Sequence, residues 1–152
     1  MNTNKAPVII GSDHAAYRLK EAVRTHLTEK HGTEVADAGT DGEFSVDYPD
    51  FGIKVAEAVS SGKFGRGILI CGTGLGMSMV ANRFSHVRAA LCNDLFSAVM
   101  SRQHNNANIL VMGGRVIGDV LAMAIVDAWL ETPFEGGRHQ SRLDKFDKIN
   151  MD

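Results

Sequence analysis

The sequence predicts an α/β fold in which helices cover both faces of a five-stranded parallel sheet. Apolar runs alternate with segments of helical periodicity, which is the pattern of strands joined by crossover helices. These runs begin near residues 6, 34, 66, 88 and 109. The central run, 67–71, is apolar throughout, as expected for a strand buried on both faces. The 152 residues contain no repeat or linker, so we expect a single domain over residues 1–152.

The first strand–helix unit occupies the N-terminal third of the chain. Residues 8–10 form a β-branched strand that ends in the polar cluster 11–14. The following helix has an apolar face and ends at Gly32. Its apolar positions are Ala16, Leu19, Val23 and Leu27. A second, weaker strand follows at residues 34–38.

The second and third units follow the same order. Residues 39–47 form a polar loop, and Pro49-Asp50 opens a helix that ends at Gly62. The third strand, 67–71, runs directly into the glycine-rich turn 72–76. A helix then extends through Phe84.

The C-terminal half contains two strands and three helices. Residues 89–92 form the fourth strand, Asp94 caps the next helix, and residues 109–112 form the fifth strand. A long helix then stops before Pro133, and its apolar stripe predicts a buried face. The stripe consists of Ile117, Val120, Leu121, Ala124, Ile125, Ala128 and Trp129. A polar terminal helix extends from Arg138 to about Asn150.

The composition excludes several classes of partner and compartment. Sixteen Lys and Arg against 18 Asp and Glu give a net charge of −2, which argues against nucleic acid and anionic membranes as partners. The N-terminus lacks the apolar core of a signal peptide, and no apolar run is long enough to span a bilayer. The two cysteines form no disulfide framework, so we expect a reducing, cytoplasmic location. No His or acidic motif has metal-ligand spacing, so we expect no metal.

Polar and glycine-rich loops follow the predicted strands and helices, and four of them carry residues able to do chemistry. These loops are Ser12-Asp13-His14, 71–76, 103–108 and 113–115. Ligands of open α/β sheets bind beyond the carboxyl ends of the strands. We therefore expect all four loops to converge on one edge of the sheet.

The turn Gly72-Thr73-Gly74-Leu75-Gly76 can present several backbone N–H groups to an anion at a helix N-terminus. It is not a dinucleotide fingerprint, because Met77 stands where the third glycine is needed, and it lacks the lysine of a phosphate loop. The alternative is a tight packing turn between strand and helix.

Cys71 ends a buried strand immediately before this turn, where a helix N-terminus can activate a thiol as a base or nucleophile. The alternative is a small buried apolar residue, which is our interpretation of Cys92. His104 lies among side-chain amides that can hydrogen-bond, but it and His14 can equally be solvated surface residues. We interpret His26, His31 and His86 as surface residues.

Three arginines near the C-terminal half can bind a phosphate. Arg138 and Arg142 lie one helical turn apart, and Arg115 follows the fifth strand. A solvated helix face is the alternative for the first two. Asp13 can hold a substrate hydroxyl or orient His14, or it can simply cap the first helix.

Five motifs in order resemble the ribose-5-phosphate isomerase B family, and the resemblance spans nearly the whole chain. They are Gly11-Ser12-Asp13-His14, Asp47-Tyr48-Pro49, residues 70–76, Ser101-Arg102-Gln103-His104-Asn105 and Glu135-Gly136-Gly137-Arg138-His139. The resemblance implies a Rossmann-like three-layer sandwich and a homodimer, possibly a tetramer, with active sites between subunits. It also implies aldose–ketose isomerisation of a phosphorylated sugar without metal or cofactor.

The resemblance further implies roles for individual residues. Cys71 matches the cysteine that moves the proton between C1 and C2, and His104 matches the histidine that assists opening of the sugar ring. The turn 72–76 matches the one that stabilises the enediolate. Residues that match substrate-binding positions are Ser12, Asp13, His14, Tyr48, Asn105, Arg115, Arg138, His139 and Arg142. Residues 72–83 contain no acid, so the chain resembles the thiol-using branch of the family.

These observations lead to one functional hypothesis and two alternatives. The hypothesis is reversible conversion of D-ribose 5-phosphate to D-ribulose 5-phosphate through an enediolate, with a cysteine base. The first alternative is a hexose 6-phosphate substrate such as D-allose 6-phosphate. The second is a non-catalytic nucleotide-binding module that uses the glycine turn and the arginines as a phosphate cradle.

Overall fold

The computed structural model describes residues 5–149 and has the predicted α/β fold. Its five strands are all parallel and lie in the order β2-β1-β3-β5-β4. The strands are β1 (Val8–Ser12), β2 (Val35–Asp37), β3 (Arg66–Cys71), β4 (Ala89–Leu91) and β5 (Ile109–Gly113). The helices are α1 (Tyr17–His31), α2 (Tyr48–Ser60), α3 (Leu75–Ala81), α4 (Leu95–Gln103), α5 (Asp119–Glu131) and α6 (Arg138–Phe146), with a short 3-10 helix, η1 (His14–Ala16), before α1.

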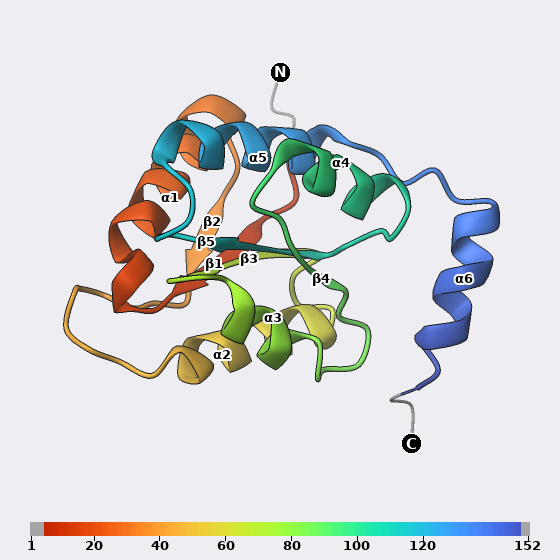
Figure 1. Ribbon diagram of the computed structural model, residues 1–152, viewed down its shortest axis with the longest axis horizontal. Coiled ribbons are helices and arrows are strands. Elements are labelled where there is room, and N and C mark those ends of the chain that lie inside the picture. Colours follow the sequence, from red (N-terminus) through yellow and green to blue (C-terminus); the bar gives the residue numbers. More distant parts are fainter. Residues whose placement is uncertain (1–4, 150–152) are drawn as a thin grey trace.

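The sheet separates two apolar cores, which gives the molecule three layers. Helices α1, α4 and α5 cover one face and α2 and α3 cover the other (Figure 1). Successive side chains of β3 alternate between the cores: Ile68 and Ile70 face the first, and Leu69 and Cys71 face the second. Burial on both faces is why β3 is apolar at every position from 67 to 71.

Helix α6 lies outside these layers, beyond one end of the sheet (Figure 1). Its contact with the rest of the chain buries Leu143 and His139. The terminal helix was predicted to reach Asn150, but it ends at Phe146, and Asn150 lies outside the described residues.

The helix after β3 is shorter than predicted. It ends at Ala81, and Phe84 lies in the turn that follows. The side-chain amide of Asn82 donates to the carbonyl oxygens of Ser78, at 3.1 Å, and Ala89, at 2.9 Å. It therefore satisfies a carbonyl at the helix end and ties that end to β4.

The buried face predicted for α5 is partly wrong. The helix begins at Asp119, after Gly118 as N-cap, so Ile117 precedes it, although Ile117 still packs in the core. Val120 is 87% exposed and Leu121 is also exposed. The buried positions are Ala122, Ile125, Val126 and Trp129. The apolar stripe in the sequence is wider than the face that touches the sheet, so periodicity alone misplaced its edge.

None of the helices in the described part of the chain is long and apolar enough to cross a membrane.

Candidate active site

Cys71 lies at the carboxyl end of β3, where three strands end together. Ser12 of β1 is in register with Ile70, and Gly113 of β5 is in register with Cys71. Cys71 is only 5% exposed, and its Sγ accepts a hydrogen bond from the backbone N–H of Gly74 at 3.2 Å. A sulfur atom thus lies at the centre of the carboxyl edge of the sheet, with a backbone donor directed at it.

The turn 72–76 packs tightly against the end of β5. A Cβ atom on Gly113 would lie 2.6 Å from the carbonyl oxygen of Thr73, so only glycine fits there without a shift of backbone. Gly74 has a left-handed backbone, with φ of +83°, and the N–H of Leu75 donates to Thr73 Oγ1 at 3.2 Å. The packing interpretation of the turn is therefore correct, and the same compact geometry holds its backbone N–H groups in place.

Tyr48 and Arg115 contact this turn from other parts of the chain. A Cβ atom on Gly76 would lie 2.6 Å from the Tyr48 ring, so that ring rests directly on the turn. The Arg115 side chain lies over Gly72, and the N–H of Arg115 donates to the carbonyl oxygen of Gly72 at 2.9 Å. A phenol and a guanidinium therefore lie against the turn that follows Cys71.

The three predicted residues Ser12, Asp13 and His14 lie at the end of β1 and the start of η1, and their side chains have different partners. Ser12 is fully buried, and its hydroxyl donates to the carbonyl oxygen of Asp13 at 3.0 Å. Asp13 caps the following helix by accepting from the N–H of Ala16 at 3.2 Å, which is the alternative that the sequence left open. His14 Nδ1 accepts from the N–H of Val46 at 3.1 Å and so ties the polar loop 39–47 to η1.

We call these residues the carboxyl-edge group: Ser12, Asp13, His14, Tyr48, Cys71, Gly72, Thr73, Gly74, Leu75, Gly76 and Arg115. The five remaining predicted site residues form an amino-edge group: His104, Asn105, Arg138, His139 and Arg142.

The amino-edge group lies at the opposite edge of the sheet, so the prediction that all four loops converge is wrong. Residues 104–108 lead into β5, and a segment that enters a parallel strand lies at its amino end. The register agrees, because Ile109 pairs with Gly67 near the start of β3. The six residues of β3 span about 17 Å between the two edges. In Figure 1, α6 lies at this end of the molecule and the loop 39–47 lies at the other.

Contacts among the end of α4, the segment before α6 and α6 itself hold the amino-edge group together. The rings of His104 and His139 stack with centroids 4.2 Å apart and 11° between their planes. Glu135 fixes this arrangement: its N–H donates to the carbonyl oxygen of Gln103 at 3.1 Å, and its Oε2 lies 3.3 Å from His139 Nε2. The sequence analysis missed Glu135, although its spacing of four residues from His139 was a usable signal.

The electrostatics of the amino-edge group suit an anion. Burial lowers the pKa of His139, and its neighbours His104, Arg138 and Arg142 lower that pKa further, against the opposing effect of Glu135. Arg138 and Arg142 themselves are exposed at one end of α6. The two exposed arginines therefore supply positive charge at this end of the molecule, beside the stacked rings of His104 and His139.

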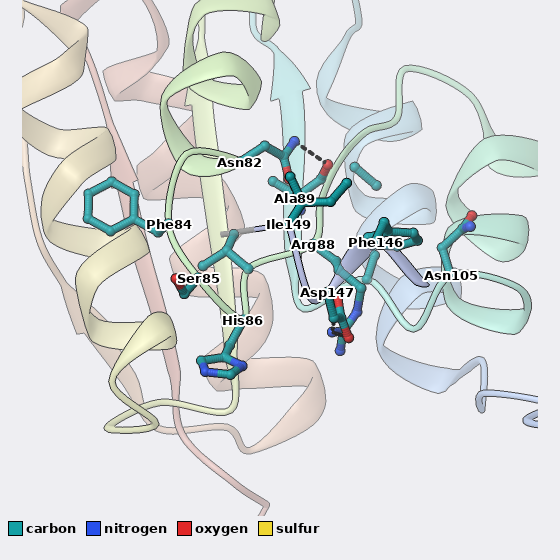
Figure 2. Close-up of a pocket in the computed structure, with 13 residues that line it drawn as sticks. Asn82, Phe84, Ser85, His86, Arg88, Ala89, Asn105, Phe146, Asp147 and Ile149 are labelled. Carbon is teal, nitrogen blue, oxygen red and sulfur yellow. Dashed lines mark hydrogen bonds and ion pairs between the residues drawn. The ribbon is translucent and has the colours of Figure 1, made fainter. Parts of the chain in front are cut away.

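A groove of about 390 Å³ lies between β4 and α6 (Figure 2). At its base Arg88 Nη1 lies 3.2 Å from Asp147 Oδ2, and Asn82 and Phe146 form parts of its wall. Asn105 also lines it, so the groove borders the amino-edge group. Among the described residues, no member of the carboxyl-edge group lines it, so it is not the space beside Cys71.

The comparison with protein families identifies the chain. The family described as Ribose/Galactose Isomerase matches residues 8–146. The chain belongs to this family. Ribose-5-phosphate isomerase B of Escherichia coli K12 is 47% identical over 144 residues, which cover 95% of this chain and 96% of that protein.

Solved structures of the family have the same fold. Ribose-5-phosphate isomerase B of Clostridium thermocellum has a TM-score of 0.91 and 55% identity, over 94% of this chain and 96% of that one. The Mycoplasma genitalium enzyme, solved with bound ribulose 5-phosphate, has a TM-score of 0.91 and 40% identity, over 96% of this chain and 97% of that one. The three-layer, Rossmann-like architecture predicted from the sequence is therefore confirmed.

Proposed function

We propose that the protein interconverts D-ribose 5-phosphate and D-ribulose 5-phosphate, with Cys71 as the base. The position of Cys71 carries this proposal: its sulfur ends a strand at the ligand-binding edge and accepts the N–H of Gly74 at 3.2 Å. The family relationship supports the same reaction, since the E. coli relative is a ribose-5-phosphate isomerase B.

The reaction needs a base, a place for negative charge and a means to open the sugar ring. The Cys71 thiolate removes the proton from C2 of the open-chain aldose, and the electron pair forms the C1–C2 double bond of an enediolate. Backbone N–H groups of the turn 72–76 hold the oxygen that becomes negative. The proton returns to C1 while a proton moves from the C2 oxygen to the C1 oxygen, which gives the ketose. His104 moves a proton between the anomeric hydroxyl and the ring oxygen before this step.

A second copy of the chain completes the site in this proposal. Cys71 and the turn lie at the carboxyl edge, whereas His104, Arg138 and Arg142 lie about 17 Å away along β3. One small sugar phosphate cannot contact both groups of the same chain. A dimer in which the amino-edge group of one copy faces the carboxyl-edge group of the other brings the base, the histidine and the arginines to one substrate, twice per dimer.

The test compares two buried cysteines. Cys71→Ala should abolish isomerisation and the exchange of the C2 hydrogen with deuterated water, while the protein still binds ribose 5-phosphate. Cys92→Ala is the matched control: Cys92 is buried, burial raises the pKa of its thiol to about 11, and the variant should stay active. Full C2 exchange by the Cys71→Ala protein would remove Cys71 from the mechanism.

The preferred sugar is measured in the same assay. Turnover of tetrose, pentose and hexose phosphates, D-allose 6-phosphate included, should give the highest kcat/KM for ribose 5-phosphate. A higher value for a hexose 6-phosphate would keep the chemistry and change the substrate.

A further inference from the structure

The Asp127 carboxylate of α5 contacts three side-chain nitrogen atoms of α1, and the proposed mechanism uses none of these residues. Its Oδ1 lies 2.7 Å from His26 Nε2 and 2.6 Å from His31 Nε2. Its Oδ2 lies 2.5 Å from Lys30 Nζ. Neither α1 nor α5 carries a residue of the carboxyl-edge or amino-edge group, so this cluster is distinct from the candidate active site.

The two imidazoles aim at one point. Their ring centroids are 5.6 Å apart, their planes meet at 68°, and both Nε2 atoms approach the same carboxylate oxygen. In this hydrogen-bonded arrangement each Nε2 donates its N–H to the carboxylate oxygen, so both N–H bonds point to one place. When the ring proton lies on Nδ1 instead, the in-plane lone pairs of the two Nε2 atoms converge there. The three ligand atoms all lie within 4.8 Å of one another.

The second cluster of similar composition lacks this convergence. His104, Glu135 and His139 also offer three ligand atoms within 4.8 Å. Their imidazoles, however, stack face to face with only 11° between the planes. In-plane lone pairs of two stacked rings run side by side, so they do not meet at one ion.

We propose that His26, His31 and Asp127 form a binding site for a divalent transition metal ion of the zinc class. Two neutral imidazoles and one carboxylate, with water in the fourth position, match the ligands and coordination number that Zn²⁺ accepts. In a tetrahedral zinc site, neighbouring ligand atoms lie about 3.3 Å apart. The carboxylate therefore has to retreat from the imidazoles by less than about 1 Å.

The cluster is partly exposed to solvent, so an ion can reach it. The His26 and Asp127 side chains are each 19% exposed, whereas the His31 side chain is 5% exposed and gives the site a buried wall. Lys30 opposes a cation by its charge, but its side chain is 56% exposed and Glu131 lies close enough to attract it. Lys30 can therefore leave Asp127 for Glu131 or solvent when a metal binds.

A bound ion would join the end of α1 to α5 and so stabilise the fold. Binding to the folded state alone raises the free energy of unfolding in proportion to the logarithm of the metal concentration. Affinity falls at acidic pH, since the metal needs neutral imidazoles and an ionised carboxylate. The charged groups facing the site are His26, Lys30 and His31 from α1, and Asp127 and Glu131 from α5.

The experiment titrates ZnCl₂ into the full-length Cys71→Ala protein at pH 7.5, because the Cys71 thiolate could itself bind zinc. Calorimetry and the thermal unfolding midpoint should report one site, and Co²⁺ should give a visible spectrum of nitrogen and oxygen ligands. His26→Gln should weaken binding at least tenfold. His86→Asn, at an exposed histidine with a left-handed backbone that Asn tolerates, should change nothing.

Two further variants make the outcome decisive. Lys30→Ala should tighten Zn²⁺ binding about fivefold, because it removes a like charge from the ion. His139→Gln, which breaks the stacked cluster, should leave affinity unchanged. The proposal is overturned if His26→Gln binds zinc as well as its parent, or if binding is lost in His139→Gln instead. An unchanged affinity in Lys30→Ala would also exclude binding at Asp127.

Discussion

Subunit complementation directly tests the proposal that each active site is formed by two chains. We consider two variants, Cys71→Ala in the carboxyl-edge group and His104→Ala in the amino-edge group, each inactive as a homodimer. In a mixed dimer, one active site combines both defects. The other combines the intact Cys71 of one copy with the intact His104 of the other, so it is a wild-type site. Mixed dimers should therefore recover half of the activity of a wild-type dimer.

Random reassociation of equal amounts makes half of all dimers mixed, so the mixture should reach about one quarter of wild-type activity. The assay mixes the two purified variants under conditions that exchange subunits and follows ribulose 5-phosphate formation against time. Two affinity tags allow the mixed dimer to be purified, and the activity of that fraction should double relative to the mixture.

A pair of variants from the same edge provides the control. Cys71→Ala mixed with a defective Arg115→Gln variant should recover nothing, because each site of the mixed dimer then carries one defect. The reasoning is refuted if mixed dimers of Cys71→Ala and His104→Ala form but stay inactive, since each chain would then use its own His104. Equal recovery in the Arg115 pair would place Arg115 with the amino-edge group instead.

Three further outcomes follow from contacts in the structure. Gly113→Ala should lower the free energy of unfolding by about 1–3 kcal/mol and reduce turnover, because the new Cβ would lie 2.6 Å from a backbone oxygen. Gly118→Ala is the control: its Cβ would have no atom within 4 Å, so this variant should unfold like wild type. Asp127→Asn should lower the free energy of unfolding at pH 7 by about 1.5–3 kcal/mol, measured by urea titration. Burial raises the pKa of Asp127, but hydrogen bonds from Lys30, His31 and His26 outweigh burial and lower the pKa overall. The loss of unfolding free energy in Asp127→Asn relative to wild type should therefore shrink as the pH falls below about 4. Arg142→Gln should lower kcat/KM for ribose 5-phosphate about tenfold or more, whereas Lys145→Gln on the same helix should not.

The order of elements could be predicted because it depends on short-range patterns. A strand segment buried on both faces, such as 67–71, is apolar at every position, and a turn that needs glycine shows its glycines in the sequence. The same reasoning correctly placed Cys71 at the carboxyl edge of the sheet, because a residue that ends such a strand lies there whatever the rest of the chain does.

Predictions that depended on distant contacts were less successful. His31 was interpreted as a surface residue, but it is buried against Asp127, which lies 96 residues away. No local pattern connects the two positions, because their meeting depends on how α1 and α5 pack on the sheet. The exposed Val120 shows the same limit: periodicity identifies an apolar stripe, whereas the packing partner decides which part of it is buried.

The position of His104 follows from the direction of the chain, which the convergence argument ignored. In a parallel sheet every segment that leaves a strand starts at one edge, and every segment that enters a strand ends at the other. Cys71 leaves β3, whereas His104 lies between α4 and the start of β5. Helix α6 joins His104 through the ring stack with His139, so Arg138 and Arg142 are held at that edge too. No rearrangement of one loop brings these residues across the sheet. If Cys71 and His104 act on one sugar, the topology itself requires that they come from two chains.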